Sequence, residues 1–136
     1  MKLITFDRKR VVDIGSSADW ISVYSTAESR LGHQKKKIPL ALAFMKTGKC
    51  DAKDGIETAR QINLMRDEFA KLSPDKVVYD IDNPKQAAPW ADDLSPVITS
   101  CANLFTTADG KDMLFEVVSI LTYAGIKEVA VTAENG

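Results

Sequence analysis

Residues 52–72, AKDGIETARQINLMRDEFAKL, carry a helical repeat of apolar side chains that decides how the rest of the chain is interpreted. Apolar residues recur every three or four positions, which is the spacing of one face of a helix. This inner stripe comprises Ile56, Ala59, Ile62 or Asn63, Met65 or Arg66, Phe69 and Leu72. Charged residues lie mostly off the stripe, and Ser73-Pro74 closes it. The stretch predicts a long amphipathic helix that packs on a core.

Two further helices are predicted upstream of this one. Ser16 or Ser17 caps a helix that runs to about Leu31, where Gly32 ends it. Pro39 suits the first turn of a short, largely apolar helix that ends at Gly48. The first of these helices has an inner stripe of Trp20, Val23 or Tyr24, Ala27 and Leu31. Both helices are therefore expected to bury apolar side chains.

Short apolar runs before and after the helices predict strands. Lys2–Phe6 and Val11–Ile14 form a possible hairpin across a charged turn. Val77–Ile81 is predicted as a strand with Val77, Tyr79 and Ile81 on one face, and about Ile98–Thr106 as the next strand. Residues 83–96 between them hold three prolines and no periodicity, which predicts a long loop.

A helix and a strand complete the chain. Thr107 or Asp109 can cap a helix from about Lys111 to Ala124, which Gly125 ends, and Glu128–Thr132 is the closing strand. The helix has an inner stripe of Met113 or Leu114, Val117 or Val118, Leu121 and Ala124. Strands at both ends of a helical middle predict one α+β domain over residues 1–136, with a small mixed β-sheet packed with about four helices.

Composition fits a globular protein of this size. The 136 residues are 45% hydrophobic and 27% charged, so the chain can bury a core. The apolar stretch at Lys2–Phe6 is too short for a secretion signal. No window approaches the roughly 18 apolar residues that span a bilayer. We expect a soluble, cytoplasmic protein with no membrane contact, in which Cys50 and Cys101 are buried thiols.

The net charge of −1 hides an uneven distribution along the chain. Residues 1–50 contain ten Lys/Arg and four Asp/Glu, whereas residues 51–136 contain eight Lys/Arg and fifteen Asp/Glu. If the acidic side chains of the second part share one face, that face attracts a basic partner. On charge alone, solvated helix faces and loops are the simpler interpretation.

The sequence shows no assembled catalytic group. The lone histidine, His33, lies in a lysine-rich loop, and nothing marks Cys50 as a reactive thiol that could pair with it. Asp80 and Asp82 could bind magnesium but fit a solvated strand end better. Asp109-Gly110-Lys111-Asp112 lacks the spacing of a phosphate or calcium loop and fits a turn before a helix. We expect no cofactor and no bound metal.

Two features suggest binding rather than catalysis. Lys35–Lys37 could contact nucleic-acid phosphates, although the flanking residues add no aromatic platform, and a solvated basic loop is the simpler reading. Trp20 lies on a helical stripe and is predicted to be core. Trp90, in the Pro/Asp loop, fits either a plug on the core or an exposed interface anchor.

Several segments together resemble the bacterial polymorphic-toxin immunity proteins, and within them the immunity family numbered seventy. The segments are Asp19–Ser22, Lys37–Pro39 with Leu42 and Gly48-Lys49, Ile62–Glu68, Leu72–Pro74, Val77–Asp80, Pro89-Trp90 and Phe105–Asp112. The last is the most specific. The match is loose over the first thirty residues, and Ala88 stands where the family has proline.

The resemblance implies an α+β protein, without catalytic residues, that binds and neutralises the C-terminal toxin domain of a contact-dependent growth inhibition effector. If that toxin is a nuclease, its substrate surface is basic, and acidic residues of this chain are the candidate contacts. The acidic candidates are Asp80, Asp82, Asp92, Asp93, Asp109 and Asp112, and Trp90 joins them as an aromatic candidate. If the toxin is acidic around its active site, Lys35–Lys37 is the better candidate. A metal-dependent hydrolase using Asp80, Asp82 or Asp109, and a nucleic-acid-binding adaptor using Lys35–Lys37, remain the alternatives.

Overall fold

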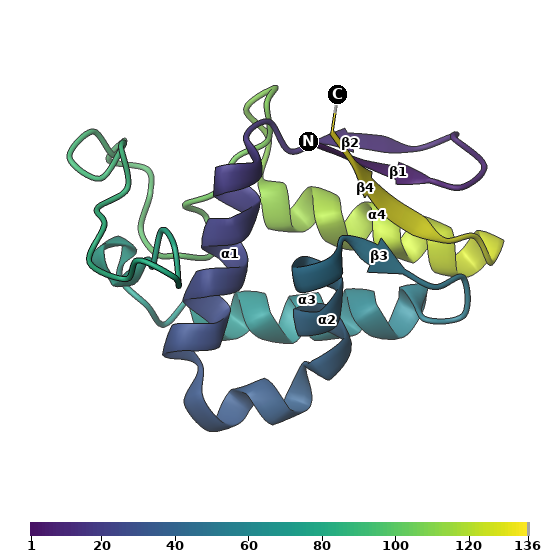
Figure 1. Ribbon diagram of the computed structural model, residues 1–136, viewed down its shortest axis with the longest axis horizontal. Helices are drawn as coiled ribbons and strands as arrows, with labels where there is room; N and C mark the ends of the chain where they lie inside the picture. The colour runs from purple at the N-terminus through teal and green to yellow at the C-terminus, as the bar shows by residue number, and fades with distance from the viewer. Residues whose placement is uncertain (136) are drawn as a thin grey trace.

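A computed structural model describes residues 1–135, which form four α-helices, two 3-10 helices and four short strands (Figure 1). In chain order the elements are β1 (Lys2–Thr5), β2 (Val11–Asp13), α1 (Ser17–Arg30), η1 (Gly32–Lys37), α2 (Pro39–Thr47), β3 (Lys49–Cys50), α3 (Gly55–Phe69), η2 (Pro74–Lys76), α4 (Met113–Lys127) and β4 (Val131–Glu134). The predicted α+β fold, with a small sheet and about four helices, is confirmed, although the sheet is antiparallel throughout and not mixed as predicted.

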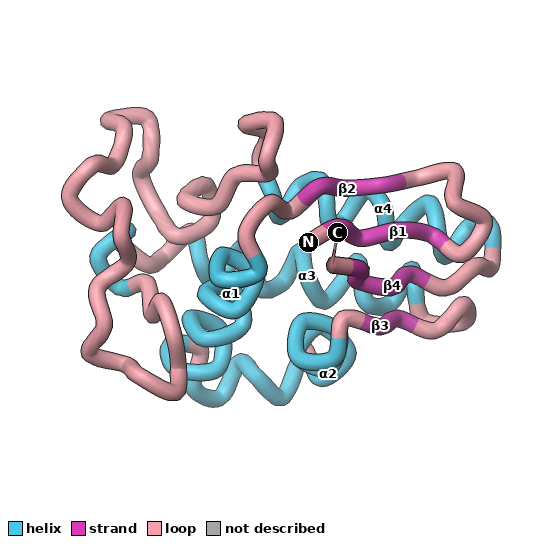
Figure 2. The backbone as a smooth tube through the Cα atoms, turned by 45° about the horizontal axis from the view of Figure 1, so that its top comes forward, coloured by secondary structure: helices cyan, strands magenta, loops and turns pink. Residues whose placement is uncertain are grey.

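The strands form one sheet in the order β2-β1-β4-β3, and all three pairings are antiparallel (Figure 2). Leu3 of β1 pairs with Val12 on one side and with Ala133 on the other. The last strand therefore lies in the middle of the sheet beside the first, which brings the described ends of the chain together. Leu3, Val12 and Val131 point to the helices and join the core.

Helix α4 lies between the sheet and α3 (Figure 1). It packs on β2 and β4 on one side and along α3 on the other. This position explains a sequence that is apolar on most sides, because a helix covered on two faces needs more than one apolar stripe. Its buried side chains are Met113, Leu114, Val117, Ile120, Leu121 and Ala124.

Two glycines let α3 and α4 touch backbone to backbone. A Cβ atom at Gly55 would lie 2.6 Å from the backbone nitrogen of Gly125. A Cβ atom at Gly125 would lie 2.6 Å from the nitrogen of Ile56. Gly125 was predicted to end the last helix, but the helix continues to Lys127 because this glycine serves packing instead. Glu128, in the left-handed region with φ 55°, ends it.

Helix α1 packs on α2 through an aromatic pair. Trp20 and Phe44 meet edge to face with ring centroids 5.5 Å apart, and the Trp20 indole N–H donates to the carbonyl of Met45 at 3.0 Å. Trp20 is 5% exposed. Its predicted place in the core is confirmed, and its polar atom is satisfied, as burial of an indole requires.

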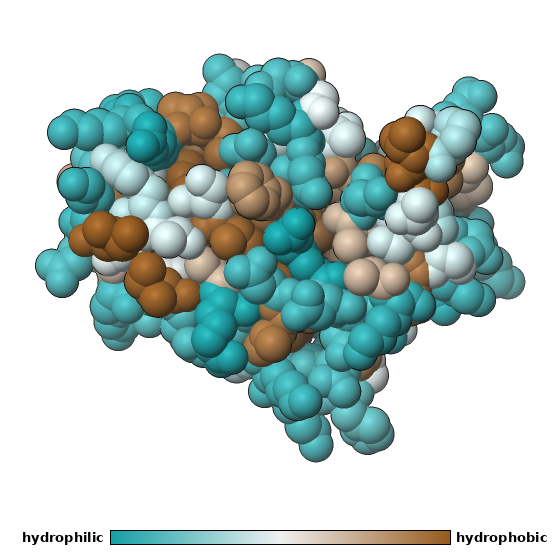
Figure 3. All heavy atoms as spheres, turned by 180° about the vertical axis from the view of Figure 1, so that it is seen from behind, coloured by the Kyte–Doolittle hydropathy of each residue, from teal (hydrophilic) through white to brown (hydrophobic). Residues whose placement is uncertain are grey.

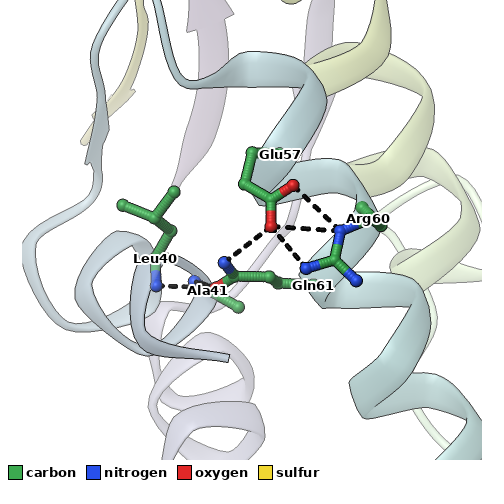
Figure 4. Close-up of polar contacts among 5 residues, drawn as sticks. All are labelled: Leu40, Ala41, Glu57, Arg60 and Gln61. Atoms are coloured by element: carbon green, nitrogen blue, oxygen red, sulfur yellow. Dashed lines mark hydrogen bonds and ion pairs between the residues drawn. The ribbon is translucent and has the colours of Figure 1, made fainter. Parts of the chain in front are cut away.

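The start of α2 is capped by a side chain from α3 (Figure 4). Ile38 precedes α2 and offers no capping side chain. The Oε1 atom of Gln61 instead accepts from the backbone N–H groups of Leu40 at 2.7 Å and Ala41 at 3.1 Å. Its amide donates to Glu57, whose pKa is lowered to about 2 by its hydrogen bonds with Arg60 and then Gln61. Two otherwise orphaned donors are thus satisfied from a neighbouring helix.

Two predicted strands are wrong. Val77–Ile81 forms no strand, because its backbone groups bond to hydroxyls of α1. The prediction placed Val77, Tyr79 and Ile81 on the buried face, but the buried side chain is that of Val78. Residues 98–106 form turns, organised by Asn103, whose side chain bonds to the backbone of residues 97, 99 and 100. Only Thr106 makes a strand-like bridge, with Asp112. Both segments are apolar because they cover the core, although they have no regular secondary structure.

Element boundaries also differ from the prediction. Helix α3 starts at Gly55 rather than Ala52 and ends at Phe69, and Ile56 is 51% exposed instead of lying on its inner stripe. The basic segment 33–37 is part of a 3-10 helix, and the closing strand begins at Val131. Strand β3 was not predicted, because its two residues carry no periodic signal.

Replacing Gln61 with methionine is expected to lower the free energy of unfolding by about 1–3 kcal/mol, because two backbone donors of α2 lose their acceptor. Urea denaturation followed by circular dichroism measures the change. Asn63→Met, at an exposed position of the same helix, is the matched control and should stay within about 0.5 kcal/mol of the parent. Equal stability of the two variants would contradict this capping role.

The Gly55→Ala variant should be less stable by about 1–3 kcal/mol despite the better helix propensity of alanine, because its methyl group overlaps the backbone of α4. Ser119→Ala, on an exposed position of α4, provides the comparison and should leave the denaturation midpoint nearly unchanged. A Gly55→Ala protein as stable as the parent would show that the two helices can move apart without loss of folding free energy, which would contradict the prediction.

Candidate functional site

The candidate contacts lie mainly in residues 77–112, which we call the long loop. It has no helix or strand and connects η2 with α4. Most of it forms the end of the molecule beside α1, opposite the sheet (Figures 1 and 2). Irregular segments of this length in compact domains are often functional. The long loop is therefore the first place to look for a site.

Hydroxyl groups of α1 hold the beginning of the long loop. The backbone N–H of Val78 donates to the Thr26 hydroxyl at 3.0 Å, and its carbonyl accepts from Ser22 at 3.1 Å. The N–H of Ile81 donates to Ser25 at 2.9 Å. These three hydroxyl residues are buried and follow one face of the helix. Together they replace the sheet ladder that would otherwise satisfy this backbone.

Trp90 packs both on the held part of the loop and against the main core. Its ring meets Tyr79 edge to face at 6.5 Å between centroids, and its side chain is half-buried. It contributes to the walls of two hollows. One, of about 330 Å³, includes Asp19, Asp93, Leu94 and Phe105, and we call it the tryptophan hollow. Trp90 is thus half-buried against the core, as the first interpretation predicted, while its role as an interface anchor stays a prediction.

Asp92 lies on the other side of Trp90. It lines the second hollow, of about 300 Å³, together with Asp75, Val77 and Gln86. Asp75 accepts from the Ser73 hydroxyl, which lowers its pKa. Asp92 and Asp93 are both exposed. The structure therefore brings Trp90, Asp92 and Asp93 together, with one carboxylate on either side of the indole.

Asp19 in the first turn of α1 adds a carboxylate to this group. Burial raises its pKa, and the Trp90 indole acts in the opposite direction by hydrogen bonding. Among residues 1–135 no lysine, arginine or histidine lies within ion-pair distance of it. Asp19 and Asp75 were not among the predicted contacts. Asp19 is far from the long loop in sequence and comes near it only in the fold, and Asp75 precedes the segment 83–96 that the sequence predicted as a loop.

Asp80 and Asp82 shape a turn of the long loop. The Oδ1 atom of Asp80 accepts from the backbone N–H of Asp82 at 2.9 Å, and Asp80 is half-buried. The side chain of Asp82 is exposed. No group of three or more His, Cys, Asp or Glu side chains that could hold a metal ion is found within residues 1–135.

Asp109 and Asp112 lie apart from Trp90, beside the sheet. The N–H of Ala108 donates to the carbonyl of Asp13 next to β2. Asp109 accepts from the Thr107 hydroxyl and pairs with Lys111 at 3.4 Å. Asp112 caps α4 by accepting from Phe115 N–H at 3.1 Å, a role predicted for Thr107 or Asp109. The predicted contacts thus do not form one site: Trp90, Asp92 and Asp93 lie together, whereas Asp109 and Asp112 lie beside the sheet.

The basic segment forms a separate surface. Lys35 pairs with Glu28 at 3.0 Å, whereas Lys36 and Lys37 are exposed on η1. In Figure 1 this helix lies below α1 and α2, away from the tip of the long loop. His33 is exposed on the same short helix. The basic segment and the Trp90 region therefore lie on different parts of the surface, although Glu28, Asp67 and Glu68 lie beside lysines of the basic segment.

Neither cysteine has the character of a nucleophile. Both are buried and free, which confirms the prediction. Burial raises the pKa of Cys50, and burial together with Asp75 raises that of Cys101 to about 11. Both groups are therefore protonated at neutral pH. Cys101 instead anchors the long loop, since its N–H donates to the carbonyl of Leu72 at 2.9 Å.

Exposed apolar side chains are scattered. On the back of the molecule, hydrophobic residues appear as separate areas within a mostly hydrophilic surface (Figure 3). The large apolar residues that are most exposed are Phe6, Val11, Ile21, Ile56, Val97, Phe115 and Ile126. Charge and the Trp90 region therefore distinguish the candidate surface better than apolar area does. Over residues 1–135, no helix combines the length and the apolar character needed to cross a membrane.

Comparison with known proteins gives one match. No curated protein and no solved structure matches the chain. A family model described as Immunity protein 70 matches residues 3–132, which includes the sheet, all four α-helices and the long loop. A match over nearly the whole chain shows the family. The chain therefore belongs to the Immunity protein 70 family, a family of immunity proteins of polymorphic toxin systems.

Proposed function

We propose that this protein binds the C-terminal toxin domain of a contact-dependent growth inhibition effector in the cytoplasm and blocks its activity. The family match over residues 3–132 carries the proposal, because an immunity protein protects a cell from a cognate toxin. We further propose that the toxin is a nuclease with a basic substrate surface. The acidic groups around Trp90 support this, since they complement such a surface.

We propose that the protein acts by occupying the substrate-binding surface of the toxin. A nuclease needs Lys and Arg side chains to hold phosphates. Exposed carboxylates at Asp82, Asp92 and Asp93 can pair with those cations and exclude the substrate. Trp90 adds a rigid aromatic edge of the kind that anchors many interfaces. No covalent step is involved in this mode, and the protonated state of both thiols is consistent with that.

The function is tested by co-expression with the toxin domain encoded directly upstream. Cells that produce the toxin domain alone should stop growing, and cells that also produce this protein should grow. The purified pair should co-elute as a stable complex, and the toxin's nuclease activity should fall in proportion to the added protein. Continued growth arrest despite equal expression, or turnover of a substrate by this protein alone, would contradict the proposal.

Reversing the charge of the loop should weaken the complex. We expect Asp92→Lys combined with Asp93→Lys to raise the dissociation constant roughly tenfold or more, with a slower association and a smaller salt dependence. Surface plasmon resonance at several salt concentrations measures all three. The matched control is Asp51→Lys with Glu134→Lys, two exposed acids near the sheet. If Lys36→Glu with Lys37→Glu weakens binding instead, the toxin contacts the basic surface.

A further inference from the structure

We propose that the tryptophan hollow receives a single arginine side chain of the toxin. This inference rests on the proposed function and assigns one residue type of the partner to one site of this chain. The hollow lies where three separate segments meet: the start of α1 with Asp19, the middle of the long loop with Trp90 and Asp93, and the stretch that leads to α4 with Phe105.

The walls of the hollow divide into an apolar part and an acidic part. Leu94, Ile98, Leu104 and Phe105 provide apolar surface that suits the three methylene groups of an arginine. Asp19 and Asp93 provide two carboxylates that suit a guanidinium, which donates in a planar fork. The Trp90 indole adds an aromatic ring, whose face attracts such a cation.

The charge of the hollow is not balanced by the chain itself. Its lining contains two carboxylates and no lysine or arginine. The carboxylate of Asp19 is partly desolvated, and no cation of residues 1–135 lies within ion-pair distance. A partly buried carboxylate without a cation costs free energy, and an incoming cation recovers it. This imbalance points to a positively charged occupant.

The other hollows near the candidate contacts are different in this respect. The hollow beside β2 contains Lys2 and Lys111, and Lys111 already pairs with Asp109. In the hollow of Asp92, the second carboxylate, Asp75, accepts from Ser73. In the tryptophan hollow, by contrast, burial raises the pKa of Asp19, the hydrogen-bond donor to this carboxylate is the neutral Trp90 indole, and no lysine or arginine lines the walls.

The test measures binding of the cognate toxin domain to four forms of this protein. Asp19→Asn and Asp93→Asn keep the side-chain shape but remove the charge, and each should raise the dissociation constant at least tenfold. Asp51→Asn, an exposed acid beside β3 and outside the hollow, is the matched control and should change it less than twofold. The Trp20 indole N–H signal, which reports on the bond to the Met45 carbonyl, should keep its position in NMR spectra of each free variant, and this separates a lost charge from an altered fold.

A double-mutant cycle then identifies the occupant. Each exposed arginine of the toxin is replaced by glutamine, and binding to the parent and to Asp19→Asn is compared. One arginine should show at least a tenfold loss against the parent and little further loss against Asp19→Asn. Parent-like binding of both Asn variants, coupling to no arginine, or coupling to a lysine instead would overturn the assignment while leaving the proposed function intact.

Absence of binding by the parent protein would contradict the proposed function instead. In that case the hollow is tested alone, by following the Trp90 indole signal during titration with N-acetyl-arginine amide. A saturable shift that the neutral analogue N-acetyl-citrulline amide does not produce, and that Asp19→Asn abolishes, would still support a guanidinium site. The Trp20 indole, bonded to Met45, serves as the internal reference. Equal responses to both compounds, or no response, would overturn the site.

Discussion

The close approach of α3 and α4 at Gly55 and Gly125 is the contact on which the rest of the structure depends. It allows α4 to lie between α3 and the sheet, so that one helix supplies apolar side chains to both neighbours. The sheet is small and offers only one face for packing. A central helix therefore carries the core that the strands alone could not provide.

Much of this architecture can be predicted from the sequence because the helices have strong periodic signals. The stripes of α1 and α3 predicted Trp20, Ala59, Ile62 and Phe69 as buried, and each is. The hairpin of β1 and β2 was also predicted, although its turn uses Arg8 in the left-handed region rather than a glycine. Errors at Ile56 and Gly125 share one cause. Both residues lie at the helix crossing, where backbone contact overrides side-chain periodicity.

The long loop shows the limit of reading apolar runs as strands. Val77–Ile81 and residues 98–106 are apolar enough to cover the core, but neither finds a sheet edge. Their backbone groups bond to Thr26, Ser25 and Asn103 instead. Such partners lie on other elements or several residues away, so a local pattern cannot reveal them. The same reason explains why Asp19 was missed, although Asp92, Asp93 and Trp90 could be selected from composition alone.

The buried hydroxyls of α1 have a consequence for how such a protein can diversify. Ser22, Ser25 and Thr26 bind main-chain groups of Val78 and Ile81 rather than their side chains. Because these hydrogen bonds involve only main-chain groups of the long loop, they do not depend on the side chains that follow Ile81. New side chains can therefore accumulate at the exposed positions between residues 82 and 96 while the helices and the sheet stay unchanged. An immunity protein whose cognate toxin changes during evolution would benefit, because its recognition residues could change without altering the residues that hold the fold.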